Sequence, residues 1–191
     1  MLHEAELFVM AETMLVEVLG RVRPQDEGIV LPPMSPRSPR PVPIGPAVER
    51  HVREDLALPG LLQGQALGPP GSAADGDVAA AAQRACAAAV AVVDGDRVLP
   101  TPEGELTARD VLLRSTLQRS LLAHYVAAYL GSTACPLPEE LARPLWELTV
   151  TDAESWRRLG WFREPMALPP HVSWRDRFLL TAGHEPHPLG H

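Results

Sequence analysis

The sequence predicts an all-α protein, a four-helix bundle with long crossover loops and short C-terminal helices. Long segments with helical hydrophobic spacing, the lack of a strong strand pattern, and the proline and glycine between these segments indicate this class. Amphipathic helices without a sheet bury their apolar faces best against one another. With 191 residues, 46% of them hydrophobic, we expect a single domain over residues 1–191, and the tail from about residue 184 has the composition of a flexible end.

Two long helices are predicted, over residues 5–22 and 108–131. In the first, apolar residues recur at helical spacing, and acidic residues such as Glu12 take the other faces. In the second, Thr107 followed by Asp110 resembles a helix start, and Gly131 is a natural end. These helices are expected to form most of the core.

Two further helices complete the predicted bundle. One has Pro46 in its first turn, where a helix tolerates proline, and runs to Pro59 and Gly60. The other covers the alanine-rich residues 78–93. Residues 31–46 hold so many prolines that neither a helix nor a central strand can form there, so they predict a stiff crossing loop.

The remaining segments are shorter. Residues 64–77 are rich in Gly, Pro, Ser and Ala and predict a flexible connection. Residues 92–99 (VVDGDRVL) fit either a small hairpin or a loop. Short helices are expected over residues 138–148 and, with helix-start signals, from Thr151 and Ser173.

The composition excludes several classes of protein and of partner. The 24 acidic residues against 17 basic ones give a formal charge of −7, so the broad basic field of a nucleic-acid binder is missing. No apolar run approaches the roughly 20 residues of a membrane span, and acidic residues stand where a secretory signal is basic. Cys86 and Cys135 are too few for a disulfide framework, so we expect a cytoplasmic protein without a nucleic-acid or membrane partner.

Three residues on predicted helices have the chemistry of metal ligands. His51 and Asp55 stand four residues apart, which places them on one face of a helix and within reach of one ion. His124 shares the apolar face of Leu117 and Leu121. Facing helices could bring these three side chains into a set of two histidines and one carboxylate, with open positions for water or substrate. The alternative is that His124 forms a hydrogen bond within the core and that Asp55 pairs with a nearby arginine.

Two further residues are candidates for contact with a small-molecule substrate. Arg119 could hold a substrate carboxylate through its planar donors, although a solvated helix arginine is the simpler interpretation. Tyr125 could donate a hydrogen bond to an intermediate, or it could serve in packing alone. For His184, His187 and His191 near the end of the chain, a surface metal site or a disordered tail is preferred over catalysis.

Three segments in the second half of the chain resemble a known family. They are residues 101–131, with TPEGELTARD leading to LLAHYVAAYLG, residues 137–162 (LPEELARPLWELTVTDAESWRRLGWF) and residues 172–186 (VSWRDRFLLTAGHEP). Their order resembles the DinB-like superfamily, which includes mycothiol-dependent maleylpyruvate isomerase. The resemblance covers most of the chain.

This resemblance implies a four-helix bundle, often a homodimer, that holds a divalent metal such as zinc, nickel or iron. In the family, a histidine on the second helix and two residues one turn apart on a later helix bind the metal. His51 matches the first position and His124 the last, while Ser120 stands where the family has Glu or His. A hydroxyl is a poor zinc ligand, so Asp55 or water would complete the set, or the metal has been lost.

The resemblance further implies a metal-dependent thiol transferase or isomerase that acts on a small organic electrophile. The metal would lower the pKa of the bound thiol mycothiol, so that it is a thiolate at neutral pH. One alternative is a non-catalytic bundle that binds a hydrophobic small molecule or a partner helix, which the serine at position 120 favours. Another is a cofactor-free isomerase or cyclase with His124 as general base and Arg119 or Tyr125 orienting the substrate.

Overall fold

The computed structural model describes residues 1–65, 77–102, 104–132 and 135–189. The predicted flexible connection over residues 64–77 therefore falls almost wholly outside the described residues, as does His191. The fold of the described residues is mostly helical, as predicted. Two short antiparallel strand pairs accompany the helices in the described residues.

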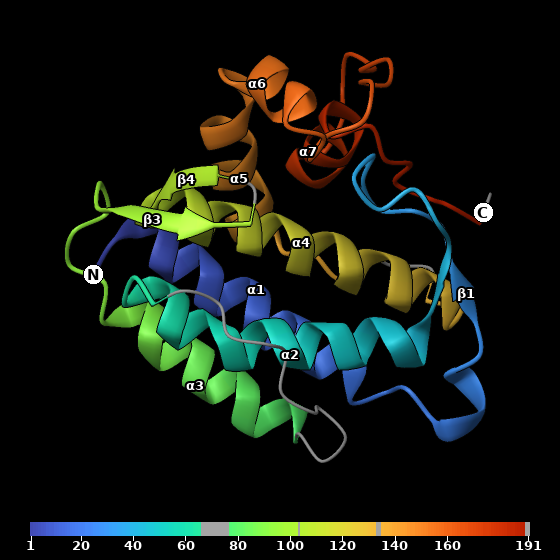
Figure 1. Ribbon diagram of the computed structural model, residues 1–191. Coiled ribbons are helices and arrows are strands. Elements are labelled where there is room, and N and C mark those ends of the chain that lie inside the picture. The colour runs from blue at the N-terminus through green and yellow to red at the C-terminus, as the bar shows by residue number, and fades with distance from the viewer. Residues whose placement is uncertain (66–76, 103, 133–134, 190–191) are drawn as a thin grey trace.

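Four long helices pack side by side in the first two thirds of the chain (Figure 1). They are α1 (His3–Leu19), α2 (Ile44–Leu62), α3 (Val78–Val90) and α4 (Ala108–Tyr129). Helix α1 packs against both α4 and α3, and α2 packs against α3. Each begins and ends close to its predicted bounds, except that α2 continues beyond Pro59 to Leu62.

Helix α4 lies deepest in the fold, because side chains around most of its circumference are buried. The hydroxyl of Thr107 accepts a hydrogen bond from the backbone N–H of Asp110 at 3.1 Å, which confirms the predicted start. On one side of α4, a core cluster joins it to α1 and to the C-terminal helices. On the other side, a second cluster joins its first turns to α1, α3 and the end of α2.

Three shorter helices cover α4 in the last third of the chain (Figure 1). They are α5 (Glu139–Val150), α6 (Ala153–Arg158) and α7 (Trp174–Thr181). The Ser173 hydroxyl accepts from the Asp176 N–H at 3.1 Å and starts α7 as predicted. The start signal at Thr151 is misplaced by one residue, because Asp152 precedes the first turn of α6 and its side chain makes no capping hydrogen bond.

The strand pairs lie in the connections between the long helices. Strands β1 (Val30–Leu31) and β2 (Val42–Pro43) pair where the chain passes from α1 to α2, after a short 3₁₀ turn at Pro24–Asp26. Strands β3 (Val98–Thr101) and β4 (Gly104–Thr107) form a hairpin that precedes α4. The hairpin that residues 92–99 suggest is thus displaced along the chain, and Val93 is exposed.

Every helix in the described part of the chain is too short or too polar to cross a lipid bilayer.

Candidate metal and substrate site

Four ionisable side chains are buried together where α1, α2 and α4 meet. Glu12 comes from α1, His51 and Asp55 from α2, and Arg119 from α4, and each is at most 3% exposed. Acidic residues and arginine are seldom buried so completely unless they are paired. We call these four residues the buried quartet.

Within the buried quartet, each carboxylate is shared between Arg119 and His51. Arg119 donates through Nε to Oε2 of Glu12 and through Nη2 to Oδ1 of Asp55. A third donor, Nη1, reaches the carbonyl oxygen of Ser115 at 3.1 Å. The other carboxylate oxygens turn to His51, whose Nε2 lies 3.1 Å from Oε1 of Glu12 and 3.2 Å from Oδ2 of Asp55. The guanidinium group thus holds both carboxylates in position.

The His51 side of the quartet has one hydrogen-bond donor too few. Nε2 of His51 carries at most one proton, so it can donate to only one of the two carboxylates. Within the described residues, Oδ2 of Asp55 is buried and has no hydrogen-bond partner. An unpaired carboxylate oxygen of this kind is expensive in a protein interior. A cation at this point would satisfy it.

Three atoms of the quartet have the arrangement of metal ligands. Oε1 of Glu12, Nε2 of His51 and Oδ2 of Asp55 belong to a group whose ligand atoms all lie within 4.8 Å of one another. Two ligands that each lie about 2.1 Å from a zinc ion are roughly 3.0–3.4 Å apart, and both distances from Nε2 fall in that interval. The group could therefore hold a metal ion.

The electrostatics of the quartet also favour an added cation. Burial raises the pKa of Glu12, but the hydrogen bond to His51 and the charge of Arg119 outweigh it, and the pKa is lowered overall. Burial raises the pKa of Asp55 to about 6, despite the opposing charges of Arg119 and His51. Arg119 stays charged, because Glu12 and Asp55 more than offset its burial and raise its pKa. Two ionised carboxylates and one guanidinium leave a single negative charge, which a proton would neutralise and which would attract a metal ion.

His124 lies in a different cluster, so the predicted set of His51, Asp55 and His124 is not the group that the structure assembles. Its Nε2 donates to the carbonyl oxygen of Glu185 at 3.0 Å, and its Nδ1 lies 3.3 Å from Sγ of Cys135. His124 follows Arg119 by five residues, which turns it about 140° around the helix axis. It therefore faces the C-terminal segment instead of α1 and α2.

Tyr125 belongs to this second cluster too. Its hydroxyl lies at hydrogen-bond distance from Nδ1 of His184, 2.8 Å away. His184 is only 1% exposed, which corrects the expectation of a surface site or a disordered tail at this residue. Burial lowers its pKa to about 3, so the ring is neutral. Neither Tyr125 nor His124 lines the pocket described next.

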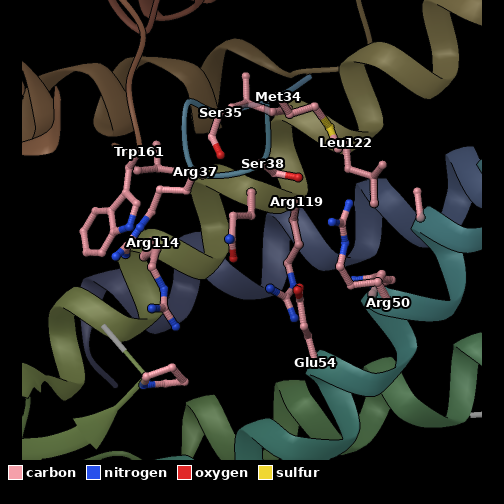
Figure 2. Close-up of a pocket in the computed structure, with 16 residues that line it drawn as sticks. Met34, Ser35, Arg37, Ser38, Arg50, Glu54, Arg114, Arg119, Leu122 and Trp161 are labelled. Carbon is pink, nitrogen blue, oxygen red and sulfur yellow. The ribbon is translucent and has the colours of Figure 1, made fainter. Parts of the chain in front are cut away.

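A pocket of about 410 Å³ opens above the buried quartet. His51 and Arg119 line its inner end, and side chains of α2 and α4 form its walls (Figure 2). The loop between β1 and β2 adds Met34, Ser35, Arg37 and Ser38, and Pro102 and Trp161 also line the pocket. The loop is supported by Gly160, whose carbonyl oxygen accepts from the N–H of Arg37 at 3.4 Å. A small molecule in this pocket would lie next to His51.

Glu12 is the site residue that sequence reasoning missed. It was assigned to a solvent-facing side of its helix, but it is 1% exposed. The signal was present in the spacing: Phe8, Leu15 and Leu19 stand four residues before, three after and seven after Glu12, so its helix face is apolar. A carboxylate on an apolar face needs a partner, and here Arg119 provides it.

In comparisons with known proteins, no protein-family model, no curated protein and no solved structure matches the chain.

Proposed function

We propose that the chain is a metal-dependent enzyme of the mycothiol-dependent transferase or isomerase type, acting on a small organic electrophile in the pocket above the buried quartet. In this proposal, α1 to α4 form a four-helix bundle of DinB-like type, and the metal is zinc, nickel or iron. One observation carries it: Asp55 Oδ2, a buried oxygen without a hydrogen-bond partner in the described chain, lies 3.2 Å from Nε2 of His51 beside an open pocket. The ligand set differs from that of the family, because Glu12 takes the place expected for His124.

Each residue of the quartet has a distinct part in this proposal. Glu12, His51 and Asp55 would hold the ion, each through one atom. Arg119 would hold the second oxygen of each carboxylate, which fixes the direction of the first. When bound, a divalent ion lowers the pKa of a thiol or water ligand, so that it is a nucleophile near neutral pH. The walls formed by α2 and α4 would exclude much of the bulk water from the reacting groups.

A second candidate function needs no metal, and Arg119 favours it. Its guanidinium already neutralises one of the two buried carboxylate charges, and a proton on His51 would neutralise the other. The same imidazole lines the pocket, so it could exchange that proton with a bound substrate. This version is a cofactor-free isomerase in which His51 replaces His124 as the acid or base.

Metal analysis separates these two functions. We expect protein purified without chelator to contain about one equivalent of metal, and the stripped protein to bind Zn²⁺, Ni²⁺ or Fe²⁺ with that stoichiometry in calorimetry. Glu12→Gln and Asp55→Asn should each lower metal affinity at least about tenfold. Glu49→Gln is the matched control, because Glu49 is an exposed carboxylate on the same helix as Asp55. His124→Ala should keep the metal.

Turnover tests the reaction itself. We expect the metal-loaded protein to consume mycothiol in the presence of the electrophile chlorodinitrobenzene, and Glu12→Gln to abolish this activity while circular dichroism shows the fold intact. If the folded protein binds no metal and isomerises substrates in excess chelator, the metal-dependent proposal is wrong and the second candidate holds.

A further inference from the structure

The lining of the pocket has a charge opposite to that of the whole protein. The chain carries a formal charge of −7, yet among the sixteen described residues that line the pocket four are arginines and one, Glu54, is acidic. A local concentration of positive charge in a cleft with apolar walls attracts anions even when the rest of the surface repels them. The arginines are Arg37, Arg50, Arg114 and Arg119.

These four arginines are not equivalent. Arg119 already donates hydrogen bonds to Glu12 and Asp55, which offset its charge, so it attracts a further carboxylate less strongly than an unpaired arginine would. Arg114 lies over the ring of Trp161, with its guanidinium carbon 5.7 Å from the ring centre. Arg114 and Arg119 both lie on α4.

Arg50 differs from the others because it makes no ion pair or side-chain hydrogen bond with any part of the chain that the structure describes. It is half-buried, lines the pocket, and directly precedes His51 on α2. In the view of Figure 2, Arg50 lies on the side of Leu122, and Arg37 and Arg114 lie on the side of Trp161. A guanidinium group presented in this way matches the two oxygens of a carboxylate.

The remaining walls suit an apolar ligand body. Leu117, Leu121 and Leu122 on α4 and Met34 on the loop contribute hydrocarbon surface, and Trp161 contributes an aromatic ring. A volume of about 410 Å³ is at the lower end for small-molecule sites, which suits a compact ligand. The lining thus combines the guanidinium group of Arg50 with apolar wall surface.

We propose that this pocket binds a small organic carboxylate, with its carboxylate group on Arg50 and its apolar body between α4 and Trp161. As the substrate class of the enzyme, this inference rests on the proposed function. Binding of the anion itself depends on Arg50 and does not require a metal, so the two can be tested separately.

Calorimetric titration of the metal-free protein with benzoate and with its neutral isostere benzamide tests the proposal. We expect benzoate to bind at least about tenfold more tightly than benzamide, because a charge-assisted hydrogen bond is lost in the amide. Arg50→Gln should remove this preference and leave benzamide binding unchanged, while Arg50→Lys should retain part of it. Arg53→Gln is the matched control, since Arg53 lies on the same helix, outside the pocket, and pairs with Glu49 at 3.9 Å.

Three outcomes would overturn the proposal. Benzoate that binds no better than benzamide would show that the pocket does not select for charge. If Arg50→Gln still bound benzoate more tightly than benzamide, to the same degree as the wild type, the anion would lie elsewhere. Phenyl phosphate that binds more tightly than benzoate would assign the site to phosphate esters instead of carboxylates.

Two variants distinguish failure of this inference from failure of the proposed function. Glu12→Gln should lose the metal and still prefer benzoate to benzamide. Arg50→Gln should lose this preference and still bind the metal. If the protein bound benzoate but no metal, the carboxylate site would be supported and the metal-dependent function would be wrong.

Discussion

Arg119 is the residue on which the candidate site depends, because it is the only cation with both Glu12 and Asp55 as hydrogen-bonded partners among the described residues. A buried charge is tolerable only when its partners are in place. Each charged group of the quartet is therefore tolerated in the interior only while the other members are present. Removing one member leaves the others buried and uncompensated.

We predict that Arg119→Met destabilises the fold by about 3–5 kcal/mol, because two carboxylates then lose their shared cation in the interior. Urea unfolding would measure this change. Arg53→Met, at an exposed pair on α2, should cost less than about 1 kcal/mol and serves as the control. Saturating Zn²⁺ should restore part of the loss in Arg119→Met. A variant as stable as the wild type would contradict the described pairing.

His184 should make the fold sensitive to acid. Burial lowers its pKa in the folded protein from 6.5 to about 3, so between these values the unfolded chain binds a proton that the folded chain does not. The free energy of unfolding contributed by this residue is fully present above pH 6.5 and is lost as the pH falls towards 3. Urea unfolding at several pH values in this window should show a smaller slope for His184→Gln than for the wild type, and equal slopes would refute the assignment.

Cys135 should react slowly despite its neighbouring histidine. Nε2 of His124 donates to Glu185, so Nδ1 is the acceptor for the thiol, yet burial raises the pKa of Cys135 to about 11. Cys86 has a pKa of about 11 for the same reason. We expect iodoacetamide at slightly alkaline pH to label both thiols far more slowly in the folded protein than in denaturant. Rapid labelling of the folded protein at Cys135, seen by mass spectrometry, would show an activated thiol instead.

At the scale of elements, two helices end at a glycine whose replacement should destabilise the fold. Gly64 after α2 and Gly183 after α7 both have positive φ, +78° and +81°, which disfavours any side chain. They differ in the space around them. A Cβ on Gly183 would lie 2.5 Å from atoms of Arg163 and Glu164, whereas a Cβ on Gly64 would have nothing within 4 Å.

Replacement by alanine should therefore lower the free energy of unfolding by different amounts at Gly64 and Gly183. Gly64→Ala should destabilise the fold by about 1–2 kcal/mol, the cost of the backbone conformation alone. Gly183→Ala should cost clearly more, because residues 163 and 164 must also move. Thermal unfolding of both variants checks this, and equal losses would mean that the segment after Phe162 is free to shift.

Local signals in the sequence were sufficient for the main helices and insufficient for the site. The periodic apolar residues of α1 and α4 and the caps at Thr107 and Ser173 act over a few residues, so they could be recognised directly. The pairing of Glu12 with Arg119 spans 107 positions in the chain and leaves no local trace. His124 was misassigned because two buried faces of α4 both look apolar from sequence alone.

For the whole molecule, the candidate metal should couple site occupancy to folding. The quartet draws its members from α1, α2 and α4, so an ion bound there would stabilise only the folded arrangement of these helices. We predict that free Zn²⁺ at a hundred times its Kd raises the free energy of unfolding by about 2.7 kcal/mol. Urea unfolding with and without zinc measures this gain. Glu12→Gln should show little gain, and a gain as large as that of the wild type would place the zinc elsewhere.

The shape of the pocket at residues 34–38 depends on Gly160, a residue outside the pocket. Gly160 lies against Arg37, and a methyl group there would lie 2.8 Å from its Cγ. A larger residue at 160 would displace the side chain of Arg37, which lines the pocket, and would leave Arg50 on the other side in place. A substitution at a residue outside the pocket, after α6, can thus change the shape of the pocket without touching Arg50.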